Sequence, residues 1–521
     1  MTGRITAHTT DLSRIKYELE LFLLGGPFDL YEDDRLIATV EHRRASADVS
    51  YSKLILSCWG EGWSRSWRVI NCEATSQYLR LQCTKQMGRT ACVLKLSRGQ
   101  VTRDAAITRD DFTSRLAAII ESNFTTMRVE RAVAARYDRQ HLSGVHARLV
   151  INDQGKVIAG IGVGERESQS NVDAALGAGI IWLDILRRKN TSINRLMIFA
   201  PSHRTDTIAT RLTAVRAAGA NVSLYEADES QGVARPVAAF DQGDLGDHLR
   251  RAAARARWPR ERALSPEVIA LVDSIRRLAP HLIETRQRGG SVLLSIRGLE
   301  FARVSTARNH VEFGPGESKE RLDPGNQSRL KELVAEVMAK RDADSDHRND
   351  PIFRAQSERW LESIIRRDVS ALDPSLDPRH VYSQVPAYRG EQRSFIDLLA
   401  VTREGRLVVI ELKVAEDAEF PFQGLDYWLR VEWHRLRGDF QRRGYFDGMK
   451  LADAAPLLYL VAPLFRFHAT TTLVASSICE RVPVYRVGIN ENWRAGVRAL
   501  LNERLNDVSG TRVQDSGREW D

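Results

Sequence analysis

The chain has few cysteines and no long hydrophobic run. Five cysteines in 521 residues are too few for a scaffold built on disulfides. The longest apolar runs, such as 457–463, fall well short of the roughly 20 residues that a membrane helix needs. Residues 1–20 also lack the apolar core of a secretory signal. We therefore expect a cytoplasmic protein with no membrane partner.

The usual nucleotide-binding signatures are also missing. Residues 160–164 read Gly-Ile-Gly-Val-Gly, but they lack both the G-x-G-x-x-G spacing and a P-loop lysine. This excludes the common dinucleotide and ATP loops. No helicase Walker motif is present, so any opening of a duplex would need a partner protein. No Ser/His/Asp or Cys/His set can be assembled from spacing alone.

The chain carries a mild basic excess, with 76 Lys and Arg against 68 Asp and Glu, a net charge of +8. This favours a polyanionic partner such as nucleic acid. Four of the cysteines lie between residues 58 and 92 without a CxxC pair, which favours buried strand residues over a zinc site. The tract 58–68 is rich in Trp, Gly and Arg. It fits either the core of a small sheet or a surface on which bases stack.

The length predicts about three or four domains at roughly 100–200 residues each. We expect a mixed α/β fold with β-rich segments. The predicted divisions are a β-rich N-terminal domain at 1–105, a first α/β segment at 106–230, a helical and β connecting region at 231–350 with a helix at 248–257, a second α/β segment at 351–505, and a tail at 506–521.

Hydrophobic periodicity and turn residues place the elements of the two α/β segments. The first segment is expected to contain helices at 109–124, 126–137, 172–188 and 205–218 and strands at 147–152, 156–163, 196–200 and 221–226. The second is expected to contain helices at 353–368, 423–440 and 491–504 and strands at 380–384, 394–402, 406–413, 457–462 and 482–487.

The two α/β segments look like an internal repeat. Residues 196–204 (LMIFAPSHR) parallel 458–466 (LYLVAPLFR), and residues 155–163 parallel 405–413. Each segment follows a β-rich piece and a helix. A duplicated module of this kind can keep its chemistry in one copy only.

The most informative residues lie in the second α/β segment. Asp397 starts one apolar strand, and Glu411 and Lys413 end its neighbour. Residues i and i+2 of a strand share a face, so antiparallel pairing is expected to bring all three together. Buried charges are costly unless they are paired or bound to a metal. Two carboxylates there can hold Mg²⁺, with Lys413 orienting or deprotonating a water.

This arrangement resembles the PD-(D/E)XK nuclease superfamily, whose signature is an Asp followed by Glu-x-Lys across a hairpin. The resemblance covers about residues 352–490, with Ile rather than Pro before Asp397. It implies a restriction-endonuclease-like core with a mixed sheet, in which Asp397 and Glu411 bind metal. The preceding helix carries Glu358 and Glu362, where the superfamily often places a further acid.

Gln423 and Tyr427 lie four residues apart on the next predicted helix, and so share one helix face. This Gln-x-x-x-Tyr element is similar to an extra motif of RecB-like nucleases. The resemblance implies that the pair holds substrate or the active site.

The repeat gives a register for comparing the two copies. It places Glu358 against Glu130 but Glu362 against Ala134. We prefer Glu362 as the third metal ligand on this basis, although the choice between the two glutamates stays open. In the same register Ala147, Ile161 and Val163 stand against Asp397, Glu411 and Lys413. The first copy is therefore expected to be a degenerate, inactive nuclease-like domain, used for dimer-like packing or for binding substrate.

The sequence thus predicts a nuclease that depends on Mg²⁺ or Mn²⁺ and hydrolyses phosphodiester bonds. The expected substrate is DNA and the expected mode is that of an endonuclease. The alternative is a non-catalytic nucleic-acid-binding or scaffold protein that retains the nuclease fold. A role in repair, restriction or defence stays open, as does a homodimer or a partner protein.

Overall fold

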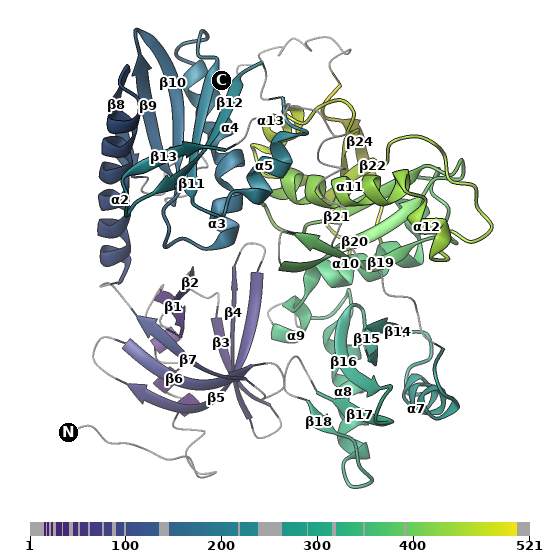
Figure 1. The fold of residues 1–521 in the computed structure, drawn as a ribbon. Coiled ribbons are helices and arrows are strands. Elements are labelled where there is room, and N and C mark those ends of the chain that lie inside the picture. Colours follow the sequence, from purple (N-terminus) through teal and green to yellow (C-terminus); the bar gives the residue numbers. More distant parts are fainter. Residues whose placement is uncertain are drawn as a thin grey trace, which may run out of the picture.

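The computed structural model shows a mixed α/β protein with four β-sheets among the residues it describes (Figure 1). These are residues 15–507 except 17, 20–21, 24–27, 34, 41–44, 51–52, 61–62, 75–77, 86–89, 98–100, 135–144, 217–218, 238–262, 289, 315–318, 347–349 and 390–391. The helix predicted at 248–257 and residues 508–521 of the predicted tail lie outside this part.

The N-terminal domain is a seven-stranded antiparallel sheet in the order β2-β1-β7-β6-β5-β4-β3, as its alternating pattern predicts. Its strands are β1 (Phe28–Glu32), β2 (Arg35–Val40), β3 (Ala45–Ser50), β4 (Lys53–Gly60), β5 (Trp63–Ala74), β6 (Tyr78–Lys85) and β7 (Thr90–Ser97). The four cysteines are buried and free in this core, as the strand interpretation expects. Trp67 is buried with them, and its Nε1 donates to Glu32 at 2.9 Å, so this ring belongs to the core.

The first α/β unit follows. Its sheet has the order β13-β12-β11-β10-β9-β8. The strands are β8 (Met127–Ala134), β9 (Ala147–Asp153), β10 (Lys156–Gly162), β11 (Arg195–Pro201), β12 (Asn221–Asp228) and β13 (Val233–Pro236). The helices are α2 (Val101–Asn123), α3 (Gln169–Asp173), α4 (Ala175–Arg187) and α5 (Asp206–Leu212). Strand β13 lies beyond the predicted boundary at residue 230.

The connecting region forms a smaller antiparallel sheet, β14-β15-β16-β17-β18, with two helices. Its elements are α7 (Pro266–Arg276), β14 (Ile283–Arg288), β15 (Ser291–Ile296), β16 (Leu299–Ser305), β17 (His310–Phe313), β18 (Glu320–Arg321) and α8 (Gln327–Lys340). Arg341, directly after α8, is fully buried. Its guanidinium donates to the carbonyls of Ile352 and Ala355 and lies 4.5 Å from the ring centre of Trp360. This residue fixes the connecting region to the second α/β unit.

The second α/β unit has a sheet in the order β19-β20-β21-β22-β23-β24. Its strands are β19 (Tyr382–Arg389), β20 (Gln392–Val401), β21 (Leu407–Leu412), β22 (Leu457–Pro463), β23 (Val484–Ile489) and β24 (Ala499–Arg504). Its helices are α9 (Pro351–Arg354), α10 (Ser357–Arg367), α11 (Phe420–Leu436), α12 (Asp439–Arg442) and α13 (Thr471–Ser476), with short 3₁₀ turns at Val369–Ala371 and Leu464–Arg466.

Two predicted helices are strands. The helix expected at 126–137 is strand β8, and the helix expected at 491–504 ends in strand β24. Both strands lie at an edge of their sheet. In β24 burial alternates residue by residue, from partly buried to exposed. Pairing with one neighbour decided the conformation of these short segments over local helix propensity.

The two α/β units share one hydrophobic core. Helices α4 and α5 of the first unit and α11 and α13 of the second lie side by side between the two sheets (Figure 1). The other face of each sheet has its own core, beneath α2 in the first unit and α10 in the second. Among the described helices, none has the length and apolar character that crossing a membrane requires.

Candidate functional site

The three residues of the Asp…Glu-x-Lys pattern lie close together around β20 and the end of β21. Every residue of β21 is buried, so its apolar sequence carries Glu411 into the interior. Leu398 pairs with Ile410, which sets Asp397 opposite Glu411 on the neighbouring strand. Lys413 follows β21 directly and is also buried. The three residues are therefore brought together as the sequence predicts. The period of two is broken at Asp397, because Ile396 and Leu399 belong to the same core while Leu398 belongs to the core on the other face.

Asp397 is held by two donors. Its Oδ2 accepts the backbone N–H of Leu412 at 3.0 Å, and its Oδ1 accepts the side-chain amide of Gln384 at 3.1 Å. The same amide nitrogen donates to Glu362 Oε2 at 2.6 Å. Gln384 has a φ of +52°, a left-handed conformation that costs a non-glycine residue energy. The left-handed backbone at Gln384 in β19 thus places its side-chain amide where it donates to the carboxylates of both Asp397 and Glu362.

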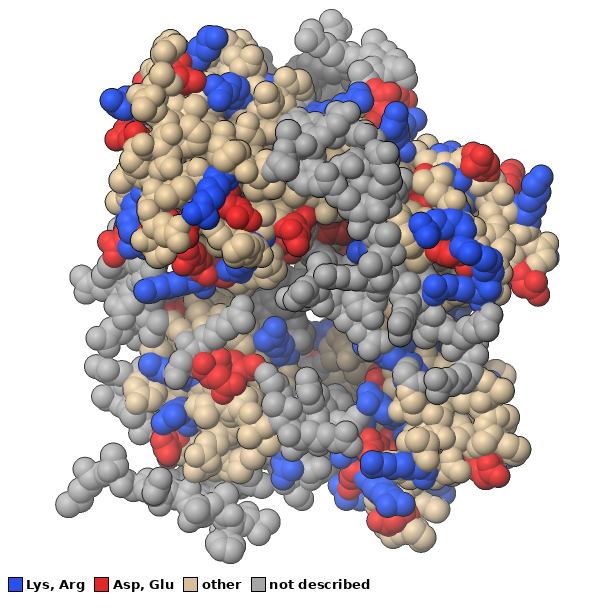
Figure 2. Space-filling model, viewed as in Figure 1, with Lys and Arg blue, Asp and Glu red and all other residues tan. Residues whose placement is uncertain are grey.

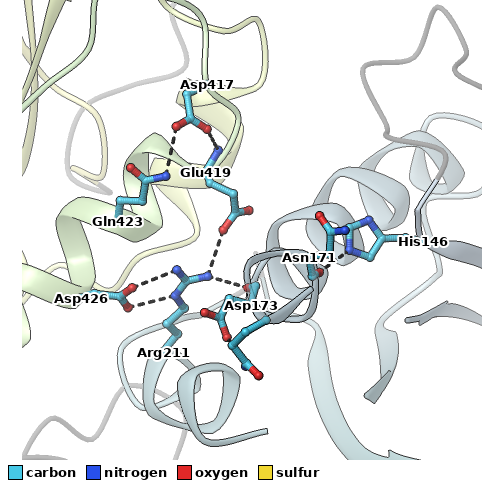
Figure 3. A network of polar contacts seen from close by, with 9 residues as sticks. His146, Asn171, Asp173, Arg211, Asp417, Glu419, Gln423 and Asp426 are labelled. Atoms are coloured by element: carbon cyan, nitrogen blue, oxygen red, sulfur yellow. Dashed lines mark hydrogen bonds and ion pairs between the residues drawn. The ribbon is translucent and has the colours of Figure 1, made fainter. Parts of the chain in front are cut away.

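Lys413 lies among carboxylates on the other side of the cluster. Its Nζ is 3.5 Å from Asp417 Oδ2 and 4.0 Å from Glu358 Oε1. Asp417 also accepts the side-chain amide of Gln423 at 3.1 Å, which joins the start of α11 to the site (Figure 3). Tyr427 lies further along α11, where it packs partly buried against the core shared by the two units. Its role in holding substrate stays a prediction.

Both early glutamates reach the site from α10. Glu362 is buried beside Gln384, with Arg359 at 3.7 Å and Arg286 of β14 at 3.9 Å from its carboxylate oxygens. Glu358, one turn earlier, contacts Lys413. The helix therefore offers one carboxylate near Asp397 and another near Lys413, and the choice between them stays open.

Four carboxyl groups lie close together in the site, with Glu362 and Glu411 buried and Glu358 and Asp397 partly buried. Burial and then the charge of Asp397 raise the pKa of Glu411 well above its usual value. Burial raises the pKa of Glu358 and Glu362 to about 7, despite the opposing effects of Lys413 and Arg359 respectively. Burial also raises the pKa of Asp397. An added cation would stabilise the ionised forms of this whole group.

Lys413 stays charged in this setting. Burial favours its neutral amine, but Glu358, Asp417 and Glu411 outweigh that effect and raise the pKa of the ammonium above its usual value. The side chain is therefore suited to positioning an anion or a water, and poorly suited to taking up a proton.

The fit of a metal ion can be judged from the donors. Among the described residues, no group of three or more His, Cys, Asp or Glu side chains is arranged as a metal cage. Mg²⁺, however, binds through one or two carboxylates with the remaining positions held by water and phosphate oxygens. Glu411 Oε2 is buried and has no hydrogen-bond partner in the described part of the chain. Asp397 and Glu411 are therefore the residues that could hold such an ion.

The first unit repeats the topology of the second. In both sheets two antiparallel pairings precede two parallel ones and a final antiparallel one. The backbone N–H of Val163 donates to Phe199, and that of Lys413 donates to Val461, both at 3.0 Å. The predicted internal repeat is therefore visible in the strand pairing itself.

Strand pairing also fixes the register between the units. Ile161 pairs with Ile198 where Glu411 pairs with Leu460, so Ile161 and Val163 occupy the positions of Glu411 and Lys413, as the sequence predicts. The position of Asp397, however, is taken by Arg148 and not by Ala147. The connection between the two strands is one residue longer in the second unit, which an ungapped alignment misses.

The alignment of Glu358 with Glu130 is wrong. Glu130 lies in strand β8, whereas Glu358 lies in helix α10. The helix that covers the same sheet face in the first unit is α2, which packs Phe112 and Leu116 against Gly162. The argument that preferred Glu362 on the basis of this alignment therefore falls away, although Glu362 does contact the site.

Sequence reasoning missed three contributors, namely Gln384, Asp417 and Arg286. Asp417 had a signal, because it stands four residues after Lys413 and six before Gln423. The left-handed backbone of Gln384 and the approach of Arg286 from another sheet carry no local signature.

Comparisons of the chain with protein-family models, with curated proteins and with solved structures find no match. The interpretation of the site therefore rests on its own residues.

Proposed function

We propose that the chain is a nuclease that requires Mg²⁺ or Mn²⁺ and hydrolyses phosphodiester bonds in DNA. The second α/β unit would form a restriction-endonuclease-like core and carry the active site. The first unit would be the degenerate copy. The observation that carries this proposal is the group formed by buried Glu411 and Lys413 with partly buried Asp397, in which Glu411 Oε2 has no hydrogen-bond partner among the described residues.

The loss of stability that comes from burying this charged group indicates that the group has a function. Buried carboxylates that repel one another destabilise a fold unless a cation or a substrate offsets their charge. At the equivalent positions the first unit has Ile161 and Val163 in its apolar core, which shows that the topology forms without these charges. Retention of the charges in the second unit favours chemistry over scaffolding.

Each residue has a role in the proposed reaction. Asp397 and Glu411 would hold the metal, with Glu362 assisting. The bound metal would lower the pKa of a water and offset negative charge on the phosphate. Lys413 would orient the water and stabilise the charge that develops on the phosphate oxygens. Gln384 and Asp417 would position Asp397 and Lys413, and Gln423 would hold Asp417.

The surface gives weaker support for a polyanionic partner. Blue and red side chains alternate over the described surface in the view of Figure 2, without a broad patch of one sign. On the described part of this face, the charges mark no single binding site. The net charge of +8 would supply a diffuse attraction of the kind that steers nucleic acid.

The test is a cleavage assay on linear, circular, single-stranded and double-stranded DNA with Mg²⁺, Mn²⁺ or EDTA. We expect product with either metal and none with EDTA. Lys413→Met removes the ammonium while keeping an apolar stem of similar length, and it should abolish the product. Binding that weakens as salt rises, with no cleavage by the wild-type protein, would instead favour the non-catalytic nucleic-acid-binding alternative.

A further inference from the structure

The two α/β units pack as a dimer within one chain. Val215 of the first unit and Ile478 of the second form an antiparallel bridge between the units. On one side the N–H of Arg216 donates to Ser477 at 2.6 Å, and on the other the N–H of Cys479 donates to Ala214 at 2.8 Å. Each unit thus gives one donor and one acceptor just beyond its short helix, α5 or α13. Exchanging the units reproduces this pattern, which is the signature of a two-fold axis.

The helices around this bridge obey the same relation. Helix α5 of the first unit lies against α11 of the second, and α13 of the second lies against α4 of the first. Gly179 of α4 and Gly424 of α11 occupy matching places, since an added Cβ would meet Leu196 in one unit and Leu458 in the other. A two-fold pair of cores therefore lies inside a single polypeptide (Figure 1).

The contacts between the two units differ in detail from one unit to the other. Arg211 of α5 is completely buried and donates to both carboxylate oxygens of Asp426 at 3.0 Å (Figure 3). It also donates to Glu419 Oε2 at 3.0 Å and to the carbonyl of Asp173 at 2.6 Å. The ring of Phe422 in α11 packs where Gly177 of α4 has no side chain. Because these contacts need different residues from the two units, they favour packing of the second unit against the first unit of the same chain over packing against a second copy of itself.

Only one member of the pair carries the charged group. Arg148, Ile161 and Val163 stand where the second unit has Asp397, Glu411 and Lys413. A two-fold pair with two active sites matches the two antiparallel strands of a duplex and can cut both. A pair with one site can reach one strand in a given orientation.

We propose that the chain, as a monomer with an internal two-fold pair, cuts one strand of duplex DNA per binding event. This inference rests on the proposed nuclease function. In each event the water oxygen forms a new P–O bond, one backbone P–O bond breaks, and the departing oxygen takes a proton. One phosphate end and one hydroxyl end result, both on the same strand.

The test uses supercoiled plasmid, the full chain and Mg²⁺ or Mn²⁺, with Lys413→Met as the inactive control. Nicked circles should accumulate to most of the plasmid before linear molecules appear, with a rate proportional to protein concentration. Linear product that appears in step with nicks would overturn the inference and leave the nuclease proposal standing. Linear product that rises with the square of protein concentration would also overturn it, because a second chain would then supply the second cut. Absence of any product would instead refute the nuclease proposal, and this inference with it.

Discussion

The two α/β units have the same strand order but different interiors where the third strand ends. In the first unit Ile161 and Val163 continue the apolar core. In the second, Glu411 and Lys413 occupy those positions, with Asp397 opposite in place of Arg148. The fold therefore does not require charges there. Burying Glu411 and Lys413 costs the second unit stability that Ile161 and Val163 do not cost the first, which is the behaviour expected of a functional site.

The largest expected effect comes from replacing the most perturbed carboxylate. Glu411→Gln should reduce cleavage by roughly 10²–10³-fold or more, because it removes one of the two proposed metal ligands. The same change should raise the free energy of unfolding in EDTA at neutral pH, because burial and the charge of Asp397 raise the pKa of Glu411 and make its ionised form costly in the folded protein. Activity assays and urea unfolding measure the two effects.

Ile161→Val is the matched control at the equivalent position of the first unit. It should cost about 1 kcal/mol of stability and leave cleavage unchanged. A Glu411→Gln protein that is less stable than wild type in EDTA would contradict the view that this carboxylate is costly.

The next effect concerns the junction between the units. Arg211→Ala leaves Asp426 and Glu419 without their buried cation, which should lower the free energy of unfolding by about 3–5 kcal/mol. Arg188→Ala removes an exposed i,i+4 pair in the same unit and should cost about 0.3–0.5 kcal/mol. Urea unfolding of both variants tests this, and equal costs would show that the junction does not stabilise the pair.

The pH dependence of stability should differ between wild type and Glu362→Gln. The pKa of Glu362 is raised to about 7, so between pH 4.5 and 7 the folded protein holds a proton that the unfolded chain releases. The protonated carboxyl of Glu362 thus contributes up to about 3 kcal/mol to the free energy of unfolding. This contribution is fully present below pH 4.5 and is lost as the pH rises through 7. Urea unfolding in EDTA should show that the free energy of unfolding of Glu362→Gln, relative to that of wild type, is higher at pH 7.5 than at pH 5.

Glu130→Gln on the exposed face of β8 is the control for a change of net charge alone. A Glu362→Gln protein that follows wild type at both pH values would refute the assignment of a buried, protonated carboxyl group.

The smallest effect is expected at the strained amide. Gln384→Gly removes the donor shared by Asp397 and Glu362 but relieves the left-handed backbone, so stability should change by less than about 1 kcal/mol. The loss of positioning should reduce kcat about tenfold with little change in KM. Gln154→Gly relieves a similar backbone, with a φ of +51°, in the first unit and should leave kcat unchanged. Equal kcat values for the two variants would remove Gln384 from the site.

Much of the second unit could be predicted because its signals are local. The apolar runs of β21 and β22 predict buried strands, and the period of two predicts that Asp397, Glu411 and Lys413 share a face. The repeated Ala-Pro at the ends of β11 and β22 revealed the duplication.

Other features depend on distant or unusual contacts. Arg211 and Asp426 form an ion pair although more than 200 residues separate them in the sequence, and no local sequence pattern predicts that pair. Strands β8 and β24 are short edge strands with partly exposed faces, so pairing decided their structure where periodicity could not. One extra residue between β20 and β21 moved the counterpart of Asp397 from Ala147 to Arg148.

The most direct test compares the two equivalent positions. Asp397→Asn and Arg148→Gln should be assayed together for metal-dependent cleavage of end-labelled DNA, with thermal unfolding to confirm that both are folded. We predict that Asp397→Asn is folded and gives no product, while Arg148→Gln cleaves at the wild-type rate. Cleavage at the wild-type rate by Asp397→Asn would contradict the assignment of the active site to the second unit.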